Sequence, residues 1–267
     1  MKKRRHLIPT RFGHIHCLEA GSGPAVLLFH INQQSSALSE PLMDVLAPRA
    51  RVIAMDYPSH GMSDHIRFQP SIADYAECGA AVMNALGAAR YVVAGEATGA
   101  AVAIEAGIRY PEHVAGVALL NCPYYRDRSH AEDRHAALKT DLRPADASGF
   151  PLPRTLAFII ERDGEHAPLR PTQEWLDRVN RAQIEAGRDR WQALDALNAY
   201  DLANRLGQLD RDTVLLMGEH FFYAAHLAEH VRRIRRLVAA EIVPEARFCM
   251  AWERPAAVAP FILRLLD

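Results

Sequence analysis

Short runs of apolar residues recur along the chain and are its most regular feature. They occupy residues 25–29, 51–55, 91–94, 114–120 and 213–217. An apolar run of this length without alternation is typical of a strand that is buried on both faces of a parallel sheet. Between the runs, residues 72–86 and 98–110 carry apolar positions at helical spacing, and Pro111 ends the second of these segments. Alternating strands and helices predict an α/β fold with a mostly parallel, doubly wound sheet.

The pattern changes between residues 123 and 206. No run typical of a buried strand occurs there, and residues 173–186 have helical spacing. The earlier rhythm then resumes, with elements predicted over residues 213–217, 224–239, 240–243 and 255–266. We therefore predict a core made of residues 1–122 and 207–267, with residues 123–206 inserted as a helical cap, or lid, over the ligand end of the sheet. A separate helical domain is the alternative interpretation.

The charge is nearly balanced, with 31 basic and 32 acidic residues in 267. Such a chain has no overall field that would favour nucleic acid or an anionic membrane surface. The four cysteines show no CxxC spacing, which is typical of reduced thiols in a cytoplasmic protein. No apolar segment reaches about 18 residues, and no apolar stretch of a secretory signal follows the basic start. We expect a cytoplasmic protein that binds a small molecule and has no nucleic acid or membrane partner, and we leave a homodimer open.

The usual sequence signatures of cofactor and metal sites are missing. No Gly-x-Gly-x-x-Gly motif follows the first predicted strand, and no phosphate-binding loop is present. His14 and His16 would point to one face of a strand, but two histidines without a third ligand are more often surface residues. We therefore expect neither a cofactor nor a metal ion.

Five polar segments lie next to the predicted strands, at residues 27–36 (LLFHINQQSS), 55–64 (MDYPSHGMSD), 92–100 (VVAGEATGA), 215–221 (LLMGEHF) and 243–255 (VPEARFCMAWERP). In this order they resemble five segments of the α/β-hydrolase fold family. These are the oxyanion loop, the D-x-P-G-x-G-x-S-D loop, the G-x-S-x-G elbow, and the two loops that deliver the catalytic acid and histidine. The resemblance covers nearly the whole chain and implies an α/β-hydrolase core with an inserted cap.

The chain departs from the family pattern at each position of the catalytic triad. Ala97 stands at the nucleophile position, although Gly95 and Gly99 of the elbow are kept. Phe221 occupies the acid position and Phe248 the general-base position. The resemblance therefore implies a member of the family that lacks the Ser-His-Asp triad, with these three residues lining the former site.

The missing side chains exclude an ordinary serine hydrolase, because losing the nucleophile or the base alone costs on the order of 10⁶ in rate. Backbone donors survive such replacements. The family's oxyanion donors correspond to the N–H of Thr98 and one from the His30 loop, either Ile31 or Asn32, so the site keeps the means to bind an oxyanion, enolate or carboxylate.

Acid–base chemistry would need another side chain. Glu96 and His30 end neighbouring strands and are our first candidates, and His220 and His226, which follow the lost acid position, are the second. The alternative is structural: Glu96 would only orient the loop through His30 or backbone amides, and the two later histidines would be solvated. Cys122 is a further candidate for a displaced nucleophile.

Aromatic residues are frequent near the former site, which suits a planar or hydrophobic ligand, although a filled pocket is the alternative. As substrate-binding residues we predict Phe222, Tyr124, Tyr125, Trp175 and Trp252.

Three functions are compatible with these residues and motifs. The first is a cofactor-independent, lyase-like or cyclase-like enzyme, in a biosynthetic pathway, that performs a decarboxylation, elimination, isomerisation or cyclisation on a small, partly aromatic metabolite. The second is a ligand-binding pseudoenzyme without catalysis. The third is a hydrolase whose catalytic residues have moved to other positions.

Overall fold

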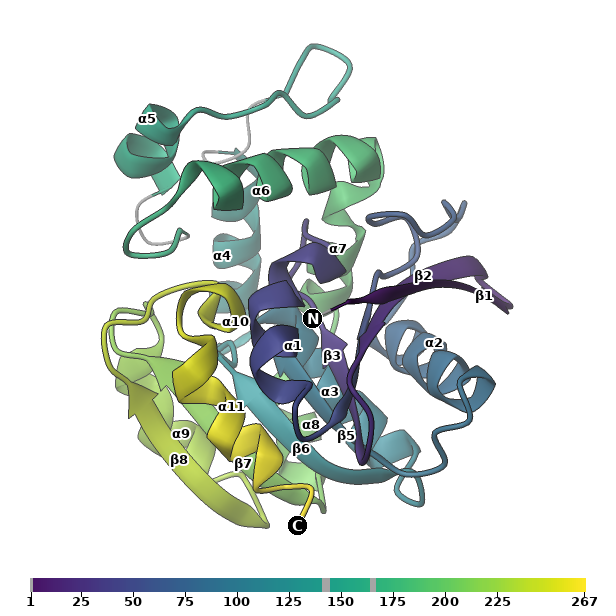
Figure 1. The fold of residues 1–267 in the computed structure, drawn as a ribbon. Coiled ribbons are helices and arrows are strands. Elements are labelled where there is room, and N and C mark those ends of the chain that lie inside the picture. The colour runs from purple at the N-terminus through teal and green to yellow at the C-terminus, as the bar shows by residue number, and fades with distance from the viewer. Residues whose placement is uncertain (1, 141–144, 164–166) are drawn as a thin grey trace.

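An eight-stranded sheet forms the centre of the molecule (Figure 1). The computed structural model describes residues 2–140, 145–163 and 167–267. The strands lie in the order β1-β2-β4-β3-β5-β6-β7-β8. Their bounds are β1 (Arg4–Thr10), β2 (Gly13–Ala20), β3 (Ala25–Phe29), β4 (Arg51–Met55), β5 (Tyr91–Glu96), β6 (Val114–Leu120), β7 (Asp212–Gly218) and β8 (Leu237–Val243).

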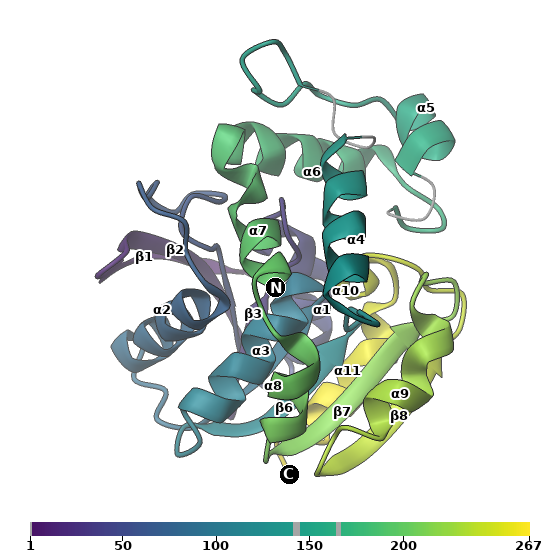
Figure 2. The ribbon, with the colours of Figure 1, turned by 180° about the vertical axis from the view of Figure 1, so that it is seen from behind.

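Most neighbouring strands run parallel, and only the pairs β1–β2 and β2–β4 are antiparallel. The helices among the described residues are α1 (Glu40–Leu46), α2 (Ile72–Ala85), α3 (Thr98–Arg109), α4 (Arg128–Thr140), α5 (Leu156–Phe158), α6 (Gln173–Ala186), α7 (Gln192–Asn198), α8 (Leu202–Gln208), α9 (Leu227–Val231), α10 (Met250–Glu253) and α11 (Pro255–Leu263). Helices α1 and α11 cover one face of the sheet, and α2, α3, α8 and α9 cover the other (Figures 1 and 2). The predicted mostly parallel, doubly wound α/β fold is confirmed.

Two hydrophobic cores follow from the alternation of side chains along the buried strands. On β3, Leu27 and Phe29 join the core beneath α2 and α3, whereas Val26 and Leu28 join the core beneath α1 and α11. Because both faces are covered by helices, the strands carry continuous apolar runs, which is why these runs could be recognised in the sequence.

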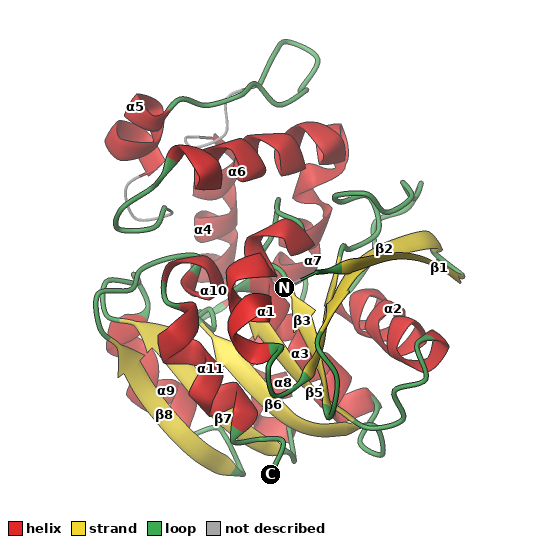
Figure 3. Cartoon of the chain, in the orientation of Figure 1, coloured by secondary structure: helices red, strands yellow, loops and turns green. Residues whose placement is uncertain are grey.

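Helices α4 to α7 lie beyond one end of the sheet, between β6 and β7 in the chain (Figure 3). Helix α8 instead packs against α3, beside the sheet. The division into a core and a cap at residues 123–206 stays a prediction. None of the helices in the described parts of the chain combines the length and the apolar composition needed to cross a membrane.

The helix predicted over residues 224–239 is wrong in its extent. A short 3-10 turn over Ala224–His226 is followed by α9, which ends at Val231. Strand β8 then begins at Leu237, opposite Thr213 of β7. Strand β8 is at the edge of the sheet and is largely exposed, so it lacks the apolar run that identified the central strands.

The carboxylate of Asp56 joins three segments of the core and is almost fully buried. It accepts hydrogen bonds from the amides of Ser36 (2.6 Å) and Met62 (2.9 Å), and it lies 2.8 Å from Nδ1 of His16. Burial by itself would raise the pKa of this carboxyl, but the His16 ring, the nearby His30 and the Met62 amide together hold the pKa below its usual value.

We expect Asp56→Asn to lower the free energy of unfolding by about 2 kcal/mol at neutral pH, because buried donors lose a charged acceptor. Since the folded-state pKa is lowered, this stabilisation is full above the unfolded pKa of about 3.9 and is lost as the pH falls further. Urea unfolding of both proteins should therefore show a constant difference near neutral pH that shrinks below about pH 4. The exposed Asp210→Asn variant is the control, and an equal loss there would contradict the prediction.

Candidate active site

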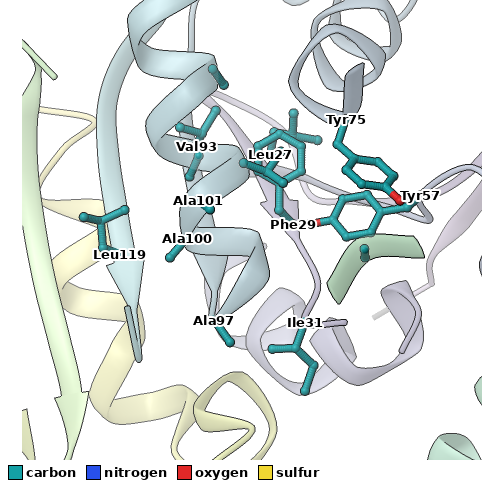
Figure 4. Packing of buried hydrophobic residues seen from close by; sticks show 14 of the residues in the cluster. Leu27, Phe29, Ile31, Tyr57, Tyr75, Val93, Ala97, Ala100, Ala101 and Leu119 are labelled. Carbon is teal, nitrogen blue, oxygen red and sulfur yellow. The ribbon is translucent and has the colours of Figure 1, made fainter. Parts of the chain in front are cut away.

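The turn between β5 and α3 has the strained geometry of a tight strand-to-helix elbow. Ala97 at its tip has φ 52° and ψ −111°, outside the regions that alanine usually occupies. A Cβ atom on Gly95 would lie 2.0 Å from the carbonyl oxygen of Gly99. The close approach of strand and helix therefore requires glycine at this position, as the motif predicted. Figure 4 shows Ala97 beside Ile31, at the same end of two neighbouring strands.

A cavity of about 50 Å³ opens beside the elbow. Ala97, Phe221 and Phe248 all line it, so the structure brings together the three positions that the sequence motifs compare with a triad. The rings of Phe221 and Phe248 stack with their centroids 5.8 Å apart. Among the described residues that line the cavity, none is Asp, Glu or His.

Asn121 connects the strand ends behind the elbow. Its Nδ2 donates to Oε1 of Glu96 at 2.9 Å and to the carbonyl of Arg247 at 2.7 Å, and its Oδ1 accepts from the amide of Gly218 at 2.9 Å. The side chain is fully buried. One amide group therefore holds the ends of β5, β6 and β7 and the loop after β8 in a fixed arrangement.

Glu96 is part of the same network and does not line the cavity beside Ala97. Its carboxylate also accepts hydrogen bonds from the amides of Met250 (2.8 Å) and Ala251 (3.3 Å). Burial raises the pKa of Glu96, although these amides and Asn121 oppose the shift. The contacts position the loop around residue 250, and a catalytic role for Glu96 stays a prediction.

His30 is buried behind the oxyanion loop, where it lines a separate cavity of about 20 Å³ together with Glu96. Its Nε2 accepts from the amide of Tyr57 at 3.1 Å, so Nδ1 carries the proton and donates to the carbonyl of Ile31 at 2.7 Å. Burial lowers the pKa of His30 to about 3, helped by the nearby His60. The ring is neutral at physiological pH, and both of its nitrogens are occupied.

His220 and His226 also lie outside the residues that line the main cavity. The His220 ring is half exposed and lies 3.7 Å from Glu219. The His226 ring stacks on Tyr124, with centroids 3.9 Å apart. Tyr124, which was expected to bind substrate, is not among the described residues that line the cavity. As with Glu96 and His30, the assignment of these histidines to catalysis stays a prediction.

The expected oxyanion residues lie close together. Ile31 and Asn32 line the cavity, and Thr98 is buried next to it, with its Oγ1 3.3 Å from Oδ1 of Asn32. Thr98 is the first residue of α3, so its amide N–H has no acceptor within the helix.

Of the residues that were expected to bind substrate, some line the cavity and others do not. Phe222, Tyr125 and Trp175 line the cavity. Trp252 lies outside the lining residues, and its ring packs against the guanidinium of Arg178 at 5.2 Å. Cys122 is fully buried and is not among the described lining residues; burial raises the pKa of its thiol to about 12, so the thiol is protonated.

Several lining residues were not among the predicted site residues, and the most polar of them are Gln34, Arg134, Arg154, Tyr223 and Cys249. Arg134 lies on α4, whose sequence is so rich in charged residues that it is typical of a solvated surface. No local pattern distinguishes Arg134 from the other charged side chains of α4, although the neighbouring motif residues did mark the region of Tyr223 and Cys249.

The chain matches the family model described as alpha/beta hydrolase fold over residues 24–234. It is 35% identical over 107 residues to the 2-(acetamidomethylene)succinate hydrolase of Mesorhizobium japonicum, a match that covers 40% of this chain and 38% of that protein. It is 26% identical over 215 residues to the pimeloyl-[acyl-carrier protein] methyl ester esterase of a Shewanella species, covering 79% of this chain and 78% of that protein. The crystal structure of an E-2-(acetamidomethylene)succinate hydrolase superposes with a TM-score of 0.78 at 21% identity and covers both chains completely, a likeness that concerns the fold.

These relatives are named as hydrolases, and the expectation of a non-hydrolytic, lyase-like or cyclase-like step is therefore wrong. That expectation was drawn from three positions without a catalytic side chain. These three positions argue against one route of hydrolysis, but they leave other routes open, because hydrolases of unrelated folds build their catalytic groups from different sequence positions.

Proposed function

The chain belongs to the alpha/beta hydrolase fold family, and on this premise we propose that it hydrolyses an ester or amide bond of a small, largely apolar molecule held in the elbow cavity. The observation that carries the proposal is the cavity itself, which lies at the elbow and is walled by stacked aromatic rings. Its hydrolase relatives supply the reaction class. We infer that residues 97, 221 and 248 correspond to the triad positions and that the catalytic groups lie elsewhere.

The side chains in the described lining that could attack a carbonyl carbon include the thiol of Cys249 and the phenols of Tyr125 and Tyr223. Burial raises the pKa of Tyr125 far above its usual value, which keeps that phenol protonated. A thiol is the stronger nucleophile at neutral pH, so Cys249 is our candidate. The sulfur would attack the carbonyl carbon, the alcohol or amine would leave with the thiol proton, and water would then hydrolyse the thioester and restore the thiol.

A second function, binding without turnover, is favoured by one specific observation. The elbow presents a methyl group at residue 97, and the described lining offers no Asp, Glu or His to accept a proton. In that case the protein would hold its ligand in the cavity and release it unchanged.

The test is a hydrolysis assay on a panel of phenyl and ethyl esters and the matching amides of small carboxylic acids, with products measured by mass spectrometry. We expect turnover that falls at least about 10³-fold in Cys249→Ala, as for the loss of a nucleophile. Cys122→Ala is the matched control and should keep its rate. Ala97→Ser should add no activity, because a serine without a base is not activated.

Turnover that survives in Cys249→Ala would place the attacking group elsewhere in the cavity. Binding of panel members without any product would overturn the hydrolase and support the second function.

A further inference from the structure

Arg134 lines the cavity, and one edge of its guanidinium is buried without a partner among the described residues. Its Nε and Nη2 atoms are shielded from solvent and have no hydrogen-bond partner among the described residues, and no ion pair involves this side chain there. The guanidinium instead lies over the rings of Phe222 and Tyr223, 4.8 and 5.9 Å from their centroids. Because a buried charge without a partner is costly, this edge is suited to an acceptor that arrives with a ligand.

The two unsatisfied atoms form the side of the guanidinium that binds carboxylates in pairs of parallel hydrogen bonds. The same chain shows this geometry elsewhere: Arg205 donates from Nε to Oε2 of Glu105 at 2.9 Å and from Nη2 to Oε1 at 2.8 Å. A planar group with two oxygens, such as a carboxylate, matches the edge that Arg134 leaves open.

Two further polar atoms in the same cavity are buried without a partner among the described residues. They are Nε1 of Trp175, a donor, and Oε1 of Gln34. Trp175 and Gln34 are 2% and 4% exposed, so bulk solvent barely reaches either side chain. Buried polar atoms in native proteins are nearly always paired, and several orphans around one cavity indicate a polar ligand.

The donors come from the helices beyond the sheet, whereas the elbow belongs to the sheet. Arg134 lies on α4 and Trp175 on α6, and Ala97 lies at the end of β5. One ligand could therefore present its charged group to α4 and α6 and its reacting bond to the elbow, with the aromatic rings around its apolar part.

We propose that Arg134 and Trp175 form a carboxylate-binding subsite, so that the ligand of this cavity is a small carboxylate with an apolar body. The reaction at the other end of the ligand rests on the function proposed above, but the recognition of the carboxylate does not.

The test is a calorimetric titration with acetate, phenylacetate and hydrocinnamate, each paired with its primary amide. Because the members of a pair share their apolar body, the difference between their affinities reports the effect of the negative charge. We expect the best carboxylate to bind at least about tenfold more tightly than its amide, since charged hydrogen bonds are the stronger ones. Arg134→Gln should remove this preference, so that each carboxylate binds no more tightly than its amide. Arg134→Lys keeps the charge without the paired donors and should lose most of the preference. Trp175→Phe keeps the ring and should weaken carboxylate binding by about threefold.

Arg128→Gln is the matched control, because Arg128 lies on the same helix but pairs with Glu132 at the surface; it should bind like the unchanged protein. Equal binding of acids and amides, no binding of any carboxylate in the set, or an unchanged preference in Arg134→Gln would each overturn the proposal. A preference for carboxylates over amides without any hydrolysis would contradict only the proposed hydrolase function. Hydrolysis of esters that carry no carboxylate, at equal rates in Arg134→Gln and the unchanged protein, would contradict only the subsite.

Discussion

Gly99→Ala is expected to lower the free energy of unfolding by at least about 3 kcal/mol, because the added methyl group has no space. A Cβ at this position would lie 2.4 Å from the carbonyl oxygen of Phe29 and 2.9 Å from that of His30. Both atoms belong to the backbone of β3 and the oxyanion loop, so neither can turn aside as a flexible side chain would. The helix and the strand would have to separate at the elbow.

Gly207→Ala is the matched control for this experiment. Gly207 is also helical, in α8, and a Cβ there meets nothing within 4 Å. Alanine should stabilise that helix by up to about 1 kcal/mol. Urea unfolding followed by circular dichroism measures both variants, and the two shifts should have opposite signs. A Gly99→Ala protein with an unchanged midpoint would show that the elbow tolerates a side chain at this position.

Arg205→Ala is expected to cost about 3–5 kcal/mol, because it leaves the buried carboxylate of Glu105 without its main partner. The side chain of Glu105 is only 4% exposed, and Arg205 reaches it from α8 through both Nε and Nη2. The hydroxyl of Tyr200 donates to the same carboxylate at 2.9 Å and would remain as a weaker partner. The pair holds α8 against α3, the helix that begins at the elbow.

The control is Arg236→Ala, which breaks a similar pair with Asp212 at 2.8 Å where both side chains are half exposed. Exposed pairs contribute about 0–1 kcal/mol, so this variant should unfold near the unchanged protein. Adding Glu105→Gln to Arg205→Ala should recover at least about 1 kcal/mol, since the charge that lost its partner is gone. Equal losses for Arg205→Ala and Arg236→Ala would mean that burial does not set the strength of the Glu105 pair.

The central sheet could be predicted from the sequence because its strands are covered on both faces. Burial on both sides requires apolar residues at every position, and this leaves a local signal that needs no knowledge of the neighbours. Helix α6 (Gln173–Ala186) was recognised for a similar local reason, since its apolar positions repeat with helical spacing. The edge strand β8 and the charged helix α4 carry no such signal, and both were missed or misplaced.

The site divides in the same way. The elbow could be recognised because Gly95 and Gly99 are required by contacts between adjacent segments, and such requirements are written into the local sequence. The direction in which the Glu96 side chain faces could not be recognised from the sequence. It depends on a hydrogen bond with the amide of Met250, which lies 154 positions further along the chain.

The sequence by itself thus determined the α/β-hydrolase fold and the elbow, since both rest on periodicity or on short motifs; the correspondence of residues 97, 221 and 248 to a triad stays a prediction. Only the tertiary structure decided which polar groups reach the cavity. It placed Arg134 there, and it engaged the side chains of Glu96 and His30 in hydrogen bonds with backbone amides outside the cavity lining. The physical reason is that a cavity wall is assembled from distant segments, and whether one side chain faces it depends on the packing and hydrogen bonds that all of those segments form together.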